Sequence, residues 1–141
     1  MMNTQTYSKN DFAKMDSMHD SIATQVSVED KTLIVIYNHL DEGVIGNDGV
    51  PFYKNPKLTI EYAIASYCDA KLFNGNSYQL IDLLEEKNEF YKLTNNCSFV
   101  SYKYAVDSFQ EITLFFDVRR KKECWSLEIS MDAEKVTYHW E

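Results

Sequence analysis

Apolar and polar side chains alternate along much of this chain, a period of two that is typical of strands. The segment 57–73 alternates most regularly, with apolar side chains on one side at Leu58, Ile60, Tyr62 and Ile64. The segment 22–28 alternates in the same way, and "TLIVIYNHL" at 32–40 is apolar on both faces, which is typical of a central strand. The pattern therefore predicts three strands, the last of them kinked near Tyr67.

The second half of the chain shows four shorter segments of the same kind. They read "SFVSYKYAV", "FQEITLFFDV", "ECWSLEISM" and "EKVTYHW", and the stretches between them, "VDSF", "RRKK" and "MDAE", predict turns. Strands that are joined by such short turns pair antiparallel with their neighbours. This half therefore predicts a meander of four strands.

Two segments have the period of a helix instead. A short helix is predicted from about Lys9 to Ser17, after the N-cap candidate Ser8. A longer helix is predicted within "NGNSYQLIDLLEEKNEFYKL", with Asn76 as its N-cap. Its apolar residues form a stripe on one side: Leu80, Ile81, Leu84 and Tyr91. The segment 41–56 holds both prolines and three of the four glycines, so it predicts the one long loop.

These elements predict an α+β fold: a twisted, mostly antiparallel sheet of about seven or eight strands, with one main helix packed on a face and a short N-terminal helix. The length of 141 residues and the hydrophobic fraction of 45% suit a single globular domain over 1–141. No apolar run approaches the roughly 18 residues of a membrane span, and the opening residues lack the apolar stretch of a secretion signal. The cytoplasm is therefore the expected location.

Acidic residues exceed basic ones, and this excess narrows the choice of partner. The chain carries a formal net charge of −8 and has a pI of about 4.8. Nucleic-acid binding depends on Lys and Arg side chains that displace counterions from phosphates, so this charge argues against it. The basic cluster "RRKK" at 119–122 is predicted to be an exposed hairpin tip. We expect a protein partner with a basic surface, or a small ligand, and neither nucleic acid nor membrane.

Three chemically active residues stand together at His19, Asp20 and Ser21. In an extended backbone, neighbouring side chains point to opposite faces, and residues two apart are separated by about 7 Å. A nucleophile and its base need a distance of about 2.6–3.2 Å, so no catalytic triad is expected here. We expect Asp20 or Ser21 to bond to nearby backbone, while His19 either packs against Met15 and Met18 or contacts a partner.

The sequence has no metal-binding or cofactor motif. His39 is followed closely by Asp41 and Glu42, but no H-E-x-x-H, H-x-H or calcium-loop pattern occurs, so no metal and no cofactor are predicted. The three cysteines are far apart and form no C-x-x-C pair: Cys68, Cys97 and Cys124. They are predicted to be reduced thiols, most of them buried.

The segment "MHDSIATQVSVEDKTLIVIYNHL", followed by "KLTIEYAIASYCDAKLFN", resembles the opening of several families of small, uncharacterised bacterial proteins, among them immunity proteins that neutralise toxins. In those families a His-Asp pair introduces a strand, a turn with acidic residues follows, and a second apolar strand returns. The resemblance covers residues 18–74 and carries over His19 and Asp20 as the motif positions. It implies no catalytic residue.

Aromatic residues concentrate on the C-terminal strands and leave two interpretations open. Phe115 and Phe116 are neighbours in one predicted strand, so they must point to opposite faces of the sheet. Either the loop and the N-terminal helix cover the second apolar face, or that face meets a partner. The terminal strand Lys135–Glu141 is a further candidate, as an exposed edge for strand pairing.

Three functions remain open at this point. The first is a noncatalytic protein-binding domain, conceivably of the immunity type. Loops carry binding residues more often than scaffold does, so its partner site is predicted at five positions: Asp41, Glu42, Asp48, Tyr53 and His19. The second is a small-ligand-binding protein or enzyme with a pocket between helix and sheet. The third is a homo-oligomer, such as a homodimer, that is held together by strand edges.

Overall fold

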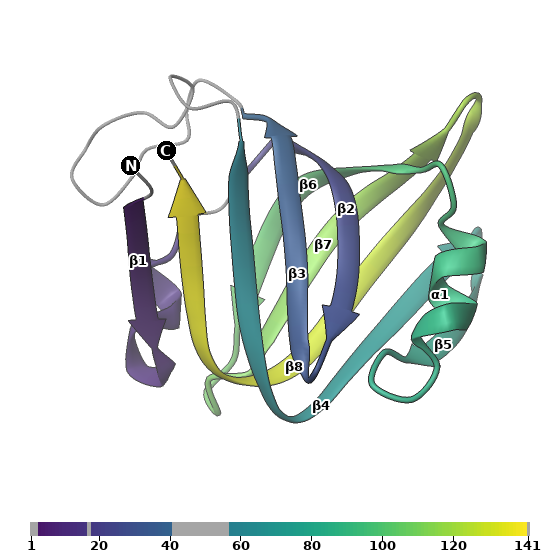
Figure 1. The fold of residues 1–141 in the computed structure, drawn as a ribbon. Coiled ribbons are helices and arrows are strands. Elements are labelled where there is room, and N and C mark those ends of the chain that lie inside the picture. Colours follow the sequence, from purple (N-terminus) through teal and green to yellow (C-terminus); the bar gives the residue numbers. More distant parts are fainter. Residues whose placement is uncertain (1–2, 17, 41–56, 141) are drawn as a thin grey trace.

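An antiparallel sheet of eight strands makes up most of the structure (Figure 1). The computed structural model describes residues 3–16, 18–40 and 57–140. Its strands are β1 (Asn3–Ser8), β2 (Ile22–Glu29), β3 (Thr32–His39), β4 (Leu58–Asn74), β5 (Ser77–Asp82), β6 (Ser98–Val106), β7 (Ile112–Arg120) and β8 (Glu123–Trp140). The 3-10 helix η1 (Lys9–Lys14) and the helix α1 (Lys87–Leu93) complete the elements. The predicted antiparallel, sheet-rich architecture is therefore confirmed, with β1 as a strand that the sequence pattern did not reveal.

The sheet closes on itself. Its strand order is β1-β8-β7-β6-β2-β3-β4-β5, and β8 also pairs with β4, so the six strands β8-β7-β6-β2-β3-β4 form a closed sheet. Strands β1 and β5 are added at the outside, each paired with a single neighbour. Closure removes most strand edges and encloses one core between the walls.

The two long strands β4 and β8 run beside each other and bend together at the bottom of Figure 1. Their register shifts between Ile64 and Cys68, where four residues of β4 span two steps of β8, and such a bulge bends a strand. The kink predicted near Tyr67 is thus confirmed. The turn predicted at "MDAE" is wrong, because β8 continues through these residues from Glu123 to Trp140.

The last part of β8 is not an edge. Residues 135–140 pair with β1 on one side and with β4 on the other, from Trp140 opposite both Asn3 and Leu58 to Lys135 opposite both Ser8 and Ala63. Both rows of backbone groups are therefore satisfied within the chain. The prediction that the terminal strand offers an exposed edge for pairing is wrong.

The long helix predicted after Asn76 is replaced by a strand and a shorter helix. Gly75 has φ 66 and is the first central residue of a two-residue turn between Asn74 and Ser77, the position that a type II′ hairpin turn reserves for glycine. The hairpin makes Ser77–Asp82 the strand β5, and only Lys87–Leu93 is helical. The predicted main helix is therefore confirmed only in its last part, Lys87–Leu93, while its first part is a strand.

Helix α1 fills a gap in the closed sheet. Strand β2 pairs with β6 only at Ile22 and Ala23, and farther along it separates from β6. There the Val28 amide donates to the Tyr91 hydroxyl at 2.8 Å, and the Val28 carbonyl accepts from Lys87 Nζ at 3.3 Å. Side chains of α1 thus take the place of a missing strand at this edge.

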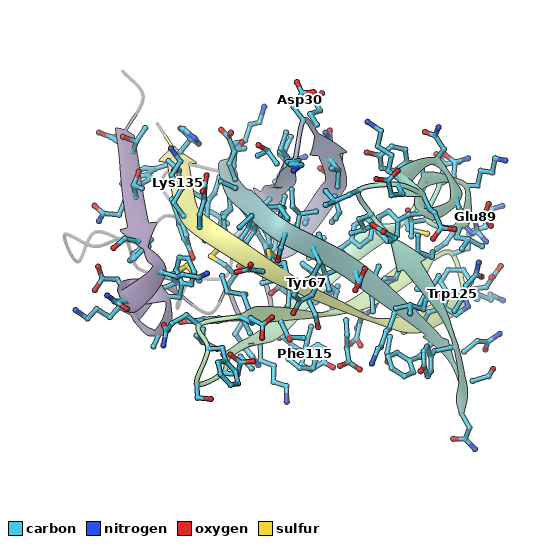
Figure 2. The ribbon with its side chains drawn as sticks, turned by 90° about the horizontal axis from the view of Figure 1, so that it is seen from below. Asp30, Tyr67, Glu89, Phe115, Trp125 and Lys135 are labelled. Carbon is cyan, nitrogen blue, oxygen red and sulfur yellow. The ribbon has the colours of Figure 1, made fainter. Side chains whose placement is uncertain are left out.

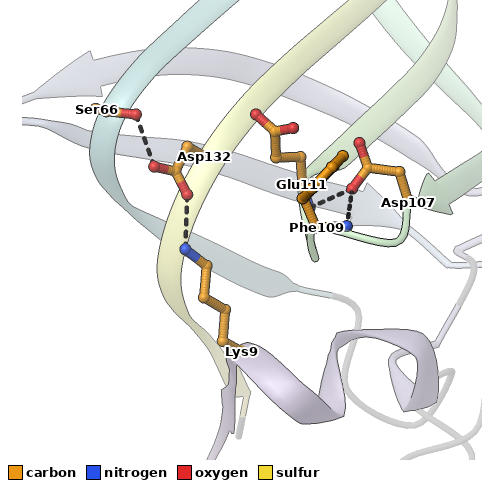
Figure 3. Close-up of polar contacts among 6 residues, drawn as sticks. All are labelled: Lys9, Ser66, Asp107, Phe109, Glu111 and Asp132. Atoms are coloured by element: carbon orange, nitrogen blue, oxygen red, sulfur yellow. Dashed lines mark hydrogen bonds and ion pairs between the residues drawn. The ribbon is translucent and has the colours of Figure 1, made fainter.

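Helix η1 packs against β1, β8 and β6 and adds one buried side chain to the core. Phe12 is fully buried, and Met15 and Met18 are buried behind it. The helix is anchored from outside by Lys9, whose Nζ lies 2.8 Å from Asp132 Oδ1 on β8 (Figure 3). Asp132 Oδ2 accepts a second hydrogen bond, of 2.6 Å, from the Ser66 hydroxyl at the bulge of β4. One carboxylate therefore joins η1, β4 and β8.

We predict that Asp132→Asn destabilises the fold by about 1 kcal/mol, because it removes a charge-assisted contact with Lys9. The hydrogen bonds from Lys9 and Ser66 lower the pKa of Asp132. Its stabilisation is thus fully present above the pKa of an unfolded aspartate and is lost as the pH falls through the lowered value. Urea unfolding at neutral and acidic pH should show a difference between wild type and variant that shrinks in acid. Glu134→Gln, an exposed neighbour, is the control, and an equal effect of both changes would contradict this role.

Candidate functional site

The His19 turn brings two of the three predicted residues together. Met18 and Asp20 have φ of 56 and 64, so residues 18–20 form a turn, and the extended backbone expected there is wrong. His19 Nδ1 lies 3.0 Å from Asp20 Oδ2, and both side chains are largely exposed. Ser21 is fully buried, with its amide bonded to the Met18 carbonyl. The structure therefore separates the hydroxyl from the His-Asp pair.

His19 also does not join the buried methionines. Met15 and Met18 face the core, whereas 61% of the His19 side chain is exposed. The turn is held instead by backbone bonds to β6, from the Asp20 amide to the Ser101 carbonyl at 2.8 Å and from the Ser101 amide to the Ser21 carbonyl at 2.9 Å. His19 stays accessible for a partner. The other predicted partner residues, Asp41, Glu42, Asp48 and Tyr53, lie outside the described residues.

The interior of the closed sheet is filled at the end that η1 covers. A cavity of about 10 Å³ lies there among buried tyrosines, Ser101 and Asp16. This volume is at the lower limit for one water molecule and far below that of a ligand pocket. The Tyr104 hydroxyl bonds to the Met15 carbonyl, and the Tyr138 hydroxyl donates to the Asp16 carbonyl at 3.3 Å. Side chains therefore fill this end of the closed sheet.

Among the described residues that line this cavity, Asp16 is the one with a charge. Its Oδ2 is buried and has no hydrogen-bond partner in the described part of the chain, and burial raises the pKa of this carboxyl to about 6. The tyrosines around it are apolar in body and stay protonated, since burial raises the pKa of Tyr62 and Tyr138 well above the usual value. A deprotonated Asp16 is therefore poorly solvated at neutral pH.

We predict that Asp16→Asn stabilises the fold at pH 7 by about 1–2 kcal/mol, a value reduced for the partial exposure of this side chain. A carboxyl with a raised pKa in the folded state opposes folding above that pKa, and the opposition disappears as the pH falls from about 6 to about 4. The variant should thus gain stability at pH 7 and match wild type below about pH 4. Thermal unfolding across this range is the measurement, and a variant that is less stable at pH 7 would refute it.

The outer face of β4, β8, β7 and β6 carries half-buried aromatic and acidic side chains. We define the acidic sheet face by the outward residues of these strands: Tyr67, Asp69, Tyr102, Phe115, Asp117 and Glu128. Phe115 lies opposite Glu128 in the β7–β8 ladder, and Asp69 lies opposite Ser130 in the β4–β8 ladder. The ladders place these side chains on one continuous surface. Figure 2 labels Tyr67 and Phe115 on this side of the molecule.

Phe115 and Phe116 separate as predicted. Phe116 is buried in the core, whereas Phe115 is only half-buried and points outward. Its ring lies 5.9 Å from the Tyr102 ring, and Lys103 Nζ lies 4.5 Å from its centroid. The second face predicted for these aromatics is therefore real, and neither η1 nor α1 covers it (Figure 1).

Carboxylates surround these rings. The Tyr67 hydroxyl donates a hydrogen bond to Glu111, and burial, Glu111, Asp107 and Asp69 together raise the pKa of Tyr67. Burial and the cross-strand neighbour Asp82 raise the pKa of Asp69. Like charges that face each other across a ladder oppose folding. Three cations share the face, Lys71 opposite Glu128, Lys103 over the Phe115 ring and Arg119 at 3.9 Å from Asp117, so the excess of carboxylates comes from its rim.

Phe109 projects at the rim of the acidic sheet face, on the turn between β6 and β7. Its side chain is 78% exposed. The turn is fixed by Asp107, whose Oδ1 accepts hydrogen bonds from the amides of Phe109 at 2.8 Å and Glu111 at 3.0 Å (Figure 3). The Asp107 amide also donates to the Glu111 carbonyl at 3.1 Å. A large apolar side chain is therefore held in solvent on an ordered turn.

An open groove lies between α1 and the sheet at the far end from η1. It has a volume of about 400 Å³, and Trp125, Arg120 and Lys92 contribute its aromatic and cationic walls. The Arg120 guanidinium lies 5.2 Å from the Trp125 ring centroid. Asn74 and Gln79 add polar groups. Cations, an aromatic ring and amide groups therefore share this hollow.

The described residues show neither a metal centre nor a membrane span. No three His, Cys, Asp or Glu side chains among residues 3–16, 18–40 and 57–140 are grouped to hold a metal ion. Within the same ranges no helix has both the length and the apolar character to cross a membrane. Cys68 and Cys97 are buried free thiols as predicted, and Cys124 is a free thiol that is exposed.

No protein-family model matches the sequence, and neither curated proteins nor solved structures give a match. The acidic sheet face and the Phe109 turn therefore rest on geometry alone. The sequence predicted a turn at "VDSF", which the structure confirms, but it also started the next strand at Phe109, whereas β7 begins at Ile112. The signal that marks the turn is Asp107, two residues before Phe109, since an aspartate commonly bonds to backbone amides just ahead of it.

Proposed function

We propose that the chain is a noncatalytic protein-binding domain that holds a basic partner through the acidic sheet face and the Phe109 turn. The observation that carries the proposal is the exposure of Phe109 on a turn fixed by Asp107. An aromatic side chain in solvent contributes nothing to the core. Because its turn is already ordered, little conformational entropy is lost when a partner covers it. Aromatic residues of this kind dominate the binding energy of many interfaces.

The charge of the face favours a cationic partner. The carboxylates of the face are offset by Lys71, Lys103 and Arg119, and Asp107 and Glu111 at the rim leave a net negative charge beside Phe109. Opposite potentials accelerate association and exclude wrong partners, and this effect weakens as salt rises. We therefore expect the partner to bind faster at low ionic strength.

The test begins with a partner captured from native cells on the immobilised chain, identified, and then purified. Titration calorimetry compares wild type with Asp117→Asn/Glu128→Gln, which removes two charges beside Phe115. Glu29→Gln/Glu89→Gln removes the same charge from exposed positions elsewhere and is the matched control. The face variant should weaken binding about tenfold or more, and the control should change it little. Equal effects of the two variants, or none, would refute the proposal.

We further propose a partner of the toxin class, in line with the resemblance of residues 18–74 to immunity proteins. Free thiols at Cys68 and Cys97 suit a reducing compartment such as the cytoplasm. The partner residues predicted from the sequence, Asp41, Glu42, Asp48, Tyr53 and His19, form an alternative site to the Phe109 turn. Co-expression of the chain with the captured protein should rescue growth if that protein is a toxin, and unchanged toxicity despite complex formation would reject this class.

The groove between α1 and the sheet favours a second function, binding of a small anionic ligand. Arg120 and Lys92 supply positive charge beside the Trp125 ring, in a hollow of about 400 Å³. Such volumes accommodate small ligands. Inorganic pyrophosphate is a simple probe, and it should shift the tryptophan fluorescence of wild type but not of Arg120→Gln. An unchanged spectrum at millimolar pyrophosphate would remove this alternative.

A further inference from the structure

Strand β5 has one unpaired edge. It is the last strand in the sheet order and pairs only with β4, in a regular ladder from Asn74 opposite Ser77 to Asp69 opposite Asp82. No other strand of the described chain pairs with its second edge. An unpaired edge offers a row of amides and carbonyls to a further strand.

The backbone groups at this edge can be assigned. The Asp82 amide donates to Glu86 Oε1 at 3.2 Å, and the Asp82 carbonyl accepts from the Glu86 amide at 2.6 Å, so both groups of Asp82 point away from β4. In an antiparallel ladder every second residue points the same way. The amides and carbonyls of Tyr78 and Leu80 therefore face outward.

The side chains of β5 leave this edge unprotected. Residues 77–81 carry no charge, proline or bulge, the features that usually block a strand edge. Tyr78 and Leu80 are 54% and 56% exposed. The other outer strand, β1, exposes only polar side chains: Asn3, Thr4, Thr6 and Ser8. The β5 edge is thus the apolar one.

We propose that two copies of the chain pair through β5, antiparallel about a twofold axis at Gln79. In this register Tyr78 of each copy lies opposite Leu80 of the other. The four outward backbone groups of each strand then find partners, giving four hydrogen bonds across the interface. A twofold axis makes the interface self-complementary, as in most homodimers.

Neighbouring registers fit less well. An axis at Leu80 would place Tyr78 opposite Asp82, whose backbone groups are already bonded to Glu86. An axis at Tyr78 would leave both Leu80 backbones beyond the paired strands. With the axis at Gln79, the outer face gains two Tyr78–Leu80 contacts, and aromatic–aliphatic pairs of this kind stabilise sheets.

Charge selects a second copy as the occupant. The chain has a net charge of −8, so two copies repel each other over most of their surfaces. Along β5 the paired residues 77–81 are neutral, and Asp82 falls outside the pairing. Because this edge is neutral, two copies that meet there repel each other less than two copies that meet at an acidic surface. The inference does not depend on the acidic sheet face.

A cysteine at the axis tests the register. Gln79 would face its own copy in a pair without hydrogen bonds, with Cα atoms about 4.5 Å apart, within the range of a disulfide. In a Cys124→Ser background, Gln79→Cys should form a disulfide dimer under mild oxidation, whereas Thr4→Cys on the β1 edge should not. A monomeric Gln79→Cys chain, or equal cross-linking of both, would overturn the register.

Analytical ultracentrifugation from micromolar to millimolar concentration tests the dimer itself. Wild type should show a reversible monomer–dimer equilibrium, and Leu80→Lys should weaken association about tenfold or more. Thr4→Lys adds the same charge on the other outer strand, β1, and should leave the constant within about twofold. A wild type that stays monomeric at millimolar concentration, or a Leu80→Lys variant that associates as wild type does, would overturn the proposal.

Discussion

Phe12→Ala should destabilise the chain by about 3–5 kcal/mol, the largest stability effect that we expect from one substitution. Phe12 is fully buried although η1 is only a six-residue 3-10 helix. Its ring belongs to the same buried core as Met15 and Met18. A short helix has little stability of its own, so its position depends on this buried side chain. Removing the ring leaves a cavity in the core and removes the buried side chain that holds η1 against the sheet.

Urea unfolding monitored by circular dichroism measures this effect. Phe109→Ala is the matched control, because it removes the same atoms from a side chain that is 78% exposed. The control should change the free energy of unfolding by less than about 0.5 kcal/mol. If Phe12→Ala were as mild as the control, η1 would not be part of the core.

The same Phe109→Ala variant should weaken binding of the captured partner by about 2 kcal/mol, or roughly 30-fold in Kd. The reason is that an exposed aromatic ring on an ordered turn acts as an anchor in a partner's pocket. Phe109→Tyr keeps the ring and should retain affinity within a few-fold. Titration calorimetry with the purified partner measures both.

This prediction separates binding from folding. Phe109→Ala leaves the core untouched, so a loss of affinity comes with an unchanged free energy of unfolding. If affinity were unchanged in the alanine variant, Phe109 would not contact the partner. The acidic sheet face alone would then have to account for binding.

Alternation of side chains predicted the strands well where one face is buried. Strands β2, β3, β4 and β7 follow their patterns, and the bulge near Tyr67 appears where the alternation breaks. The turn predicted at "MDAE" was wrong because a short run of polar residues resembles a turn. In the structure Asp132 and Glu134 lie on the outside of a bent strand, where polar side chains meet solvent.

The helix predicted after Asn76 failed for a different reason. Leu80, Ile81 and Leu84 match a helical stripe, but the pair Gly75-Asn76 just before them, with glycine in the first position, is a hairpin signal. Long-range pairing of β5 with β4 then decided between the two patterns. Local sequence carries no information on such pairing, which is also why the closure of β8 against β4 was not foreseen.

The candidate site was the least predictable part. The notion that His19, Asp20 and Ser21 lie on an extended backbone failed because Met18 and Asp20 adopt positive φ. The acidic sheet face gathers residues from four strands, and only the strand order places them side by side. The sequence predicted that Phe115 and Phe116 point to opposite faces, but which of the two is outward, and what surrounds it, depends on the closure of the sheet.

Hydrogen–deuterium exchange with and without the purified partner tests the central claim most directly, because it shows where the partner binds. The account predicts slower exchange at residues 107–111 and at the β4 bulge around Tyr67, with little change in β1 and in the turn between β2 and β3. Protection that is absent from 107–111 and confined to other segments, such as 18–21 or 41–56, would contradict it.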